Sequence, residues 1–408
     1  MVIAAAAAAI FAVHTPLRQG DDPVWFLYSD NAEDAPQFLS NLVTAMITMA
    51  TLVISITMVV LTLAAQQLGP RLIRSFMADR RTQATLGLFV ATVIYLLLVL
   101  RSVSGSVEQV PNLAVTGGTV LVLLCLVALL IFMHHLARSI IADNIIDRVG
   151  ADLDADIGRI LPDADFTQAS PPDKRPSETG APLTLTSSGY VQALNHNKIV
   201  EIAKEADALI EISFKPGRHV VEGTRFAWTA PAEAASEELR DRVESCLMLG
   251  GERASVQDME TSIRQLVEVA LRALSASISD PFTATAVIDR LTISLAKIMR
   301  RGPAQTIWTD DDDTVRLLAP NSSFGDSVEE AFRQIRQHGH DEPAVLIRLV
   351  ESLGQLLALA DDDQRLILEK QIEMVLETGR RNIEQKQDLA TLEERVEQAL
   401  NEGSTRSN

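Results

Sequence analysis

Cysteine is almost absent from this sequence, which has Cys125 and Cys246 as its two examples among 408 residues. Two cysteines so far apart exclude a disulfide framework and the clustered spacing of a structural zinc site. Cys125 lies within a long apolar run. We therefore expect both side chains to be reduced and to act as buried small hydrophobes.

Recognisable catalytic motifs are also missing. The sequence has no glycine-rich phosphate loop, no HExxH and no GxSxG. Its seven histidines are scattered, and the HGHDE segment at 338–342 is the best metal candidate among them. We interpret that segment as cap and turn residues between two helices. The sequence therefore predicts no enzyme, no metal and no cofactor.

Charge is scarce in the first third of the chain. Residues 1–138 carry seven arginines, no lysine and seven acidic residues, so the whole net charge of −18 belongs to the remainder. An acidic region of this kind should be repelled by nucleic acid and by anionic lipid headgroups. We expect no nucleic-acid partner.

Long apolar runs take the place of charge. The runs 42–66, 84–100 and 116–137 are long enough to span a bilayer, and none contains Asp, Glu, Lys or Arg. That absence argues against a proton relay or a charge-coupled pump. A fourth run, 1–13, falls short of the ~30 Å apolar core. We interpret it as a short span or as a helix that starts upstream, with a cleaved signal as the alternative.

The placement of arginines predicts the orientation. The connection after the 42–66 run is richer in arginine than the other two connections, which carry one each. Its arginines are Arg71, Arg74, Arg80 and Arg81. The positive-inside rule places this connection, and the acidic region after 138, in the cytoplasm of a bacterial inner (plasma) membrane. We interpret the arginines as topological charge; an anion-attracting inner mouth and contact with membrane lipid are the alternatives.

The first long run has a polar face. At about 100° per residue, one arc of about 80° collects hydroxyl and amide side chains along the whole run. They are Asn41, Thr44, Thr48, Thr51, Ser55, Thr62 and Gln66. Two interpretations remain open: close helix–helix packing, and a water-lined path at the axis of a homo-oligomer.

The rest of the chain predicts an α+β cytoplasmic domain after an α-helical multi-span membrane domain at 1–138. Residues 139–160 have helical periodicity and continue the last span, and 162–182 form a Pro- and Asp-rich linker, so that 139–182 connects the two domains. A small, β-rich, barrel-like module is expected at 183–232, with turns at Pro216-Gly217 and Gly223. Residues 233–408 predict a mainly helical module with a hairpin near 304–319.

Two segments of the helical module collect polar side chains. The set is Arg253, Gln257, Asp258, Arg272, Ser275, Asp280 and Thr283. If they converge, a buried ion-pair network is the favoured interpretation and a ligand site the alternative. Within the segment ALSASISDPFTA (273–284), Ser279 or Asp280 suits a helix N-cap and Pro281 the first turn. Phe282 is then expected to enter the core.

Several stretches resemble the uncharacterised bacterial membrane-protein family called domain of unknown function 2254. They occur in order along nearly the whole chain: Gln67–Leu72, Gly189–Gln192, Pro216-Gly217 with Gly223, Arg253 with Gln257-Asp258, Ala273–Ser275, Asp280–Ala284 and Phe332–Arg336. Ser279 departs from the family pattern, which suggests Asn there, and the amino end is shorter than the family's first helix. The resemblance implies a multi-span membrane protein with a cytoplasmic domain and implies no activity.

Two functions fit these observations. The first is a homo-oligomeric channel or transporter with a regulatory cytoplasmic domain, suggested by the polar face at 41–66. The second is a membrane-anchored scaffold or sensor whose cytoplasmic domain binds a protein or a small-molecule ligand, suggested by the size of that domain.

Overall fold

The structure, a computed structural model, describes residues 34–68, 80–105, 112–139, 142–163, 166–254 and 256–404. The chain divides into two compact units, Met1–Asn144 and Ile145–Asn408. The short span predicted at 1–13 lies outside the described residues, as do Arg71 and Arg74.

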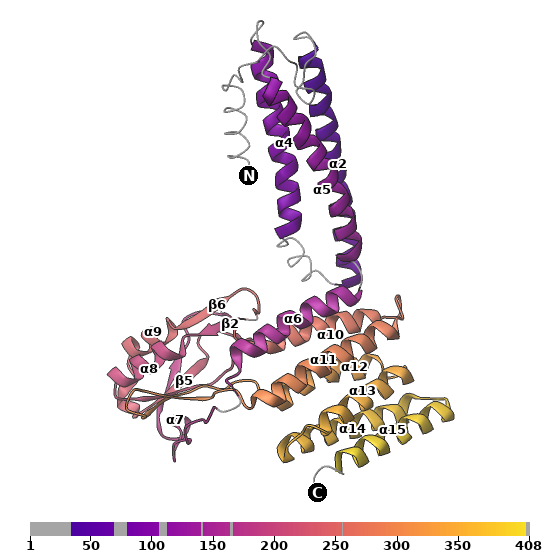
Figure 1. Cartoon of the computed structure of the whole chain (residues 1–408). Helices are drawn as coiled ribbons and strands as arrows, with labels where there is room; N and C mark the ends of the chain where they lie inside the picture. Colours follow the sequence, from indigo (N-terminus) through magenta and orange to yellow (C-terminus); the bar gives the residue numbers. More distant parts are fainter. Residues whose placement is uncertain are drawn as a thin grey trace. The chain divides into compact units, whose positions relative to one another are not determined.

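Three long helices form the described part of the first unit (Figure 1): α2 (Ala35–Leu68), α4 (Arg80–Gly105) and α5 (Asn112–Ser139). Each is apolar over a length that crosses a bilayer, at Ala35–Thr62, Thr82–Val103 and Leu113–His134. The three predicted spans are therefore confirmed.

The three helices pack on one another around a shared apolar core that includes Phe89, Leu96 and Cys125. Two polar contacts join α4 to α5. The Tyr95 hydroxyl donates to the carbonyl oxygen of Ala114 at 3.1 Å, and the Thr92 hydroxyl lies 3.2 Å from the Cys125 sulfur. Cys125 is a free, fully buried side chain, as its position in an apolar run predicts.

The β-rich part of the second unit consists of two sheets. The five-stranded sheet has the order β1-β5-β3-β8-β7 and the three-stranded sheet the order β4-β2-β6. The strands are β1 (Ala181–Thr184), β2 (Gly189–Leu194), β3 (Leu209–Ile212), β4 (His219–Val220), β5 (Arg225–Ala230), β6 (Leu247–Gly250), β7 (Ile307–Thr309) and β8 (Val315–Leu318). Helices α8 (His196–Glu205) and α9 (Glu237–Glu244) pack with them around Ile199, Phe226 and Val243. A single turn, α7 (Pro176–Thr179), precedes β1.

The barrel-like closure expected here is wrong, because the strand order leaves β1 and β7 as the ends of an open sheet. Residues 183–194 hold the end of β1 and the whole of β2, which belong to different sheets. The hairpin β7–β8 joins the sheet through parallel pairing of Ile210 in β3 with Leu317 in β8. Such pairing between distant segments has no local sequence signal. For that reason the sequence predicts the hairpin as part of the helical module 233–408.

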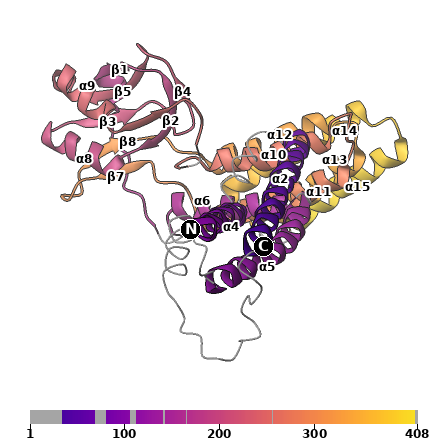
Figure 2. The same cartoon turned by 90° about the horizontal axis from the view of Figure 1, so that it is seen from above.

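The helical part of the second unit, orange to yellow in Figure 2, is three helix pairs in two rows. One row is α10 (Met259–Ala273), α12 (Phe324–His338) and α14 (Asp362–Asn382). The other is α11 (Pro281–Arg301), α13 (Pro343–Leu357) and α15 (Lys386–Ser404). Contacts run along each row, α10 with α12 with α14 and α11 with α13 with α15. Each pair thus buries its apolar faces against the next, as in stacked helical repeats.

The helix starts follow ordinary capping chemistry. Asn195 caps α8 by accepting from the backbone N–H of Lys198, and Asp280 caps α11 by accepting from that of Thr283. Pro281 occupies the first turn of α11, where no backbone donor is needed. The predictions for Asp280 and Pro281 are confirmed, but the one for Phe282 is wrong: its side chain is 85% exposed. An N-cap sets where a helix starts, but the packing of its neighbours decides which side of the first turn is covered.

Candidate functional site

The polar face of α2 points outward from the three-helix unit. Asn41, Thr44, Thr48, Thr51, Ser55 and Thr62 are all exposed among the residues the structure describes, whereas Thr57 on the opposite side is 7% exposed. The side chain of Gln66 lies outside the described residues. Since Ile47, Ile54 and Leu52 flank this face and are also exposed, the hydroxyls occupy the middle of the uncovered side of α2.

Four of the hydroxyls on this face bond within α2. Thr44, Thr48, Thr51 and Thr62 each donate to the carbonyl oxygen four residues earlier, at 2.8–2.9 Å. This bonding satisfies each hydroxyl donor in an apolar solvent and leaves the oxygen lone pairs on the surface. The face is therefore compatible with lipid, yet it offers acceptor groups to a neighbouring helix or to a solute.

The four arginines of the connection after α2 have no described side chains. Arg80 and Arg81 form the start of α4, and their side chains, like residues 71 and 74, lie outside those described. Their interpretation as topological charge, anion attraction or lipid contact stays a prediction.

The predicted polar cluster is two separate groups, because α10 lies between them. Arg253, Gln257 and Asp258 precede the helix, and Arg272 and Ser275 lie at its end. Fifteen residues at 1.5 Å each separate the two by about 20 Å. At the second end, the Ser275 hydroxyl donates to the Arg272 carbonyl oxygen at 2.7 Å, and the Thr283 hydroxyl donates to Asp280 at 2.6 Å.

The group at the start of α10 is an ion-pair network. Arg253 donates to Asp258 and, at 3.2 Å, to Glu260. Lys215 donates to Glu260 at 2.6 Å and to Asp326 at 3.2 Å. Asp258 also accepts from the Thr261 hydroxyl at 2.8 Å. Burial opposes ionisation of Glu260, but Lys215, Ser322 and Arg253 hold the pKa of this carboxyl below its ordinary value.

This network joins three parts of the second unit: the turn after β3, the start of α10 and the start of α12. Gly217, in that turn, has a φ of +86°, and a Cβ at this position would lie 2.0 Å from the Asp258 carboxylate. Lys215, Glu260 and Asp326 belong to this network although the sequence pattern does not predict them as members. The Ser323–Asp326 capping box was detectable from its spacing, but nothing local marks Lys215 as its partner. Every charge is paired, which favours a structural role over catalysis.

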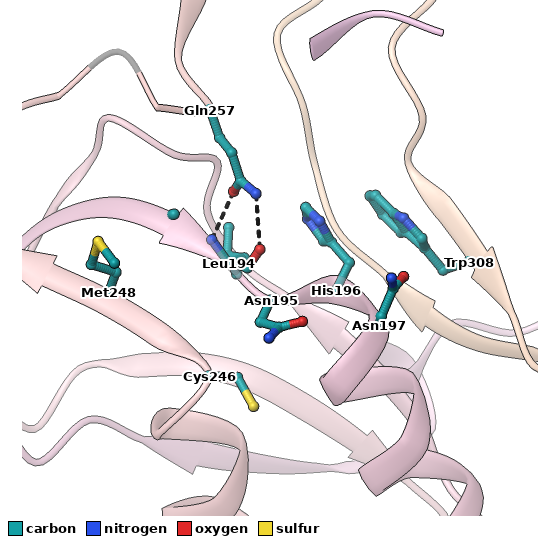
Figure 3. A pocket seen from close by; sticks show the side chains of 9 residues that line it. Leu194, Asn195, His196, Asn197, Cys246, Met248, Gln257 and Trp308 are labelled. Carbon is teal, nitrogen blue, oxygen red and sulfur yellow. Dashed lines mark hydrogen bonds between the residues drawn. The ribbon is translucent and has the colours of Figure 1, made fainter. Parts of the chain in front are cut away.

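Gln257 belongs to a different contact. Its side-chain amide donates to the Leu194 carbonyl oxygen at 2.9 Å and accepts from the Leu194 N–H at 2.7 Å (Figure 3). The side chain thereby acts as one more strand residue at the end of β2.

A hollow of about 380 Å³ opens beside this contact, lined by His196, Met248, Cys246 and Trp308 among others. The rings of His196 and Trp308 stack face to face, with centroids 4.2 Å apart and planes 7° from parallel (Figure 3). Burial lowers the pKa of His196 from 6.5 to about 4, so the ring is neutral at ordinary pH. Neither ring nitrogen has a hydrogen-bond partner among the described residues.

The HGHDE segment (338–342) lies at the end of α12 and in the turn that follows it. His338 and His340 place Nδ1 3.0 Å from the carbonyl oxygens of Gln334 and Gln337, in the turn after α12. Within the described ranges, no three His, Cys, Asp or Glu side chains gather as metal ligands would.

Comparison with known proteins agrees with this architecture. A family model described as "Predicted membrane protein (DUF2254)" matches residues 1–355. The chain belongs to this family. The DUF2254 protein is also 29% identical over 389 residues to Uncharacterized protein Rv1290c of Mycobacterium tuberculosis and to Uncharacterized protein Mb1321c of Mycobacterium bovis, over 92% of this chain and 74% of each relative. No solved structure matches the DUF2254 chain.

Proposed function

We propose that this DUF2254 protein is a homo-oligomeric channel or transporter of the bacterial inner membrane. Copies of α2 would turn their hydroxyl faces to a common axis, and the C-terminal unit would lie in the cytoplasm as a regulatory domain. The observation that carries the proposal is the outward position of Asn41, Thr44, Thr48, Thr51, Ser55 and Thr62 on a membrane-spanning helix.

Physical chemistry favours a position of this face at an axis shared by several copies over a position against lipid. Lipid gains nothing from a continuous row of hydroxyl oxygens, whereas small hydroxylated residues allow close approach of helices. A partly dehydrated solute can also exchange water for such oxygens. The cytoplasmic placement rests on the arginine-rich connection at 71–81.

The double substitution Thr48→Val with Thr51→Val tests the proposal. Removal of the two hydroxyls, at ~1 kcal/mol each, should slow solute passage by roughly thirtyfold. The measurement is efflux of potassium, chloride and glycerol from liposomes that contain the full chain.

The matched control is Thr57→Val, the same change on the buried side of α2, which should leave efflux as it is. Disulfide cross-linking adds a test of the oligomer: cysteine at Thr48 or Thr51 should join copies, and cysteine at Ile54 should not. Absence of efflux for all three solutes would count against transport. Cross-linking at Ile54 as strong as at Thr48 would count against the shared axis.

The hollow beside His196 favours a second candidate, a membrane-anchored sensor whose C-terminal unit binds a small planar ligand. Such a ligand at a hundred times its Kd would raise the free energy of unfolding by about 2.7 kcal/mol. Thermal-shift measurements of the full chain against a panel of heteroaromatic compounds would show this gain. Trp308→Leu should abolish it, whereas Trp228→Leu in β5, outside the lining, should keep it. Equal shifts in both variants would exclude this hollow.

A further inference from the structure

The corner between α10 and α11, residues 274–282, is an unusual piece of surface. Phe282 is 85% exposed, more than any other large apolar side chain in the described ranges, and Ile278 is 44% exposed. The neighbouring Ala276, Ser277 and Ser279 are also exposed, and they are uncharged. Asp280 is the one acidic or basic residue of the corner, and Thr283 engages its carboxylate as the cap of α11.

The corner lies at the same level as the start of α6 (Ala142–Ile160). Helices α6 and α11 run in the same direction: Asp154 accepts from Arg290 at 2.6 Å, and Arg301 donates to the carbonyl oxygen of Leu161 at 2.9 Å. A Cβ on Gly150 would also meet the Arg290 side chain. Eight residues back along each helix, about 12 Å, Ala142 stands level with Phe282.

The covalent chain limits how far the start of α6 can lie from the bilayer. The apolar window of α5 ends at His134, eight residues before Ala142. Eight residues cover about 12 Å as helix and at most ~29 Å when fully extended. The polar interfacial layer of the bilayer occupies the first several ångströms of that distance.

The distribution of charge also favours this corner as the part of the C-terminal unit that contacts lipid. Residues 139–408 carry 29 basic and 47 acidic residues, which anionic headgroups repel. A loop whose one charge, Asp280, is engaged by Thr283, and from which a Phe and an Ile protrude, is the kind of surface that enters the headgroup–acyl boundary. Apolar burial there stabilises binding by about 25 cal/mol per Å². The occupant that fits is therefore the lipid bilayer.

We propose that the 274–282 corner is a membrane anchor of the C-terminal unit, with Phe282 and Ile278 inserted into the lipid interface on the side of the bilayer where α5 ends. The anchor would fix the end of the helix pairs at which α10 passes into α11. It is independent of whether α2 lines a path for solutes.

Fluorescence tests the anchor in the full chain, reconstituted in phosphatidylcholine vesicles with a minor share of phosphatidylglycerol. Phe282→Cys and Ile278→Cys each receive an environment-sensitive thiol dye. The control is Leu366→Cys, 68% exposed near the start of α14, at the far end of the helix pairs. Cys125 and Cys246 are buried, and the dye signal of the parent chain is subtracted.

We expect a blue-shifted emission at 282 and 278 that brominated acyl chains quench, and a water-like, unquenched emission at 366. Quenching at 282 alone still supports the anchor and places Ile278 at a shallower depth. Unquenched emission at both corner positions, equal to that at 366, overturns the proposal. So does a blue shift that persists in detergent and is insensitive to brominated lipid, because it would show contact with a second copy of the chain.

Discussion

Asp258→Ala is expected to lower the free energy of unfolding of the C-terminal unit by about 3–5 kcal/mol, the largest effect of any single substitution considered for this chain. Asp258 is 2% exposed and pairs with Arg253, whose side chain is 16% exposed. The substitution leaves a largely buried guanidinium that, among the described residues, keeps the ion pair with Glu260 at 3.2 Å. It also removes the cap on the Glu260 N–H, which is worth about 1 kcal/mol.

Asp280→Ala is the matched control. Asp280 is likewise an N-cap, on α11, but its carboxylate contacts Thr283 and no arginine. The hydrogen bonds from Thr283 hold the pKa of Asp280 below its ordinary value. Loss of a cap alone should cost about 1 kcal/mol, so the difference between the two variants measures the ion pair.

The two variants are compared by urea unfolding of the full chain in detergent. Unfolding is monitored by the fluorescence of Trp228 and Trp308, which lie in β5 and β7. If Asp258→Ala and Asp280→Ala cost the same, the Arg253–Asp258 pair contributes nothing beyond capping. If either variant reduces efflux and leaves stability unchanged, the substituted carboxylate belongs to the functional machinery.

Acidification from pH 6.5 to pH 4 is expected to destabilise the C-terminal unit through His196, by at most ~3 kcal/mol. Burial lowers the pKa of this ring from 6.5 to about 4. Above pH 6.5 the ring is neutral in the folded and unfolded chain, and stability does not depend on its proton. Between the two values the unfolded chain binds a proton that the folded chain excludes, so stability falls as the pH falls. Below pH 4 both states bind the proton and the loss is complete.

His196→Phe isolates this contribution, since phenylalanine keeps a ring against Trp308 and cannot titrate. As the pH falls through this window, the free energy of unfolding of wild type should fall relative to that of the variant. His340→Phe, at an exposed turn position, serves as the control. Parallel pH profiles of wild type and His196→Phe would show that the ring is open to solvent and that the hollow is not a sheltered site.

Features with a local cause were predictable. The three spans follow from apolar windows that no other fold accommodates at that length. Asn195 and Asp280 start their helices because a side-chain oxygen there satisfies a backbone N–H within three residues.

Features that join distant segments were not predictable. The polar set around α10 was expected to converge, yet the rigid length of the helix holds Arg253 and Arg272 apart. Lys215 meets Glu260 and Asp326 across three separate elements. His196 meets Trp308 because β8 pairs with β3, which brings the β7–β8 hairpin beside α8.

The sequence by itself therefore determined that this is a multi-span membrane protein with a large acidic α+β unit, because span length, charge distribution and capping are properties of short stretches. Only the tertiary structure decided which side of each element is covered. It exposed the hydroxyl face of α2, since α4 and α5 pack against the opposite side. It exposed Phe282, since the neighbours of α11 cover Ala284, Val287 and Ile288 instead. Periodicity marks a face of a helix, but the partner that covers it comes from elsewhere in the chain.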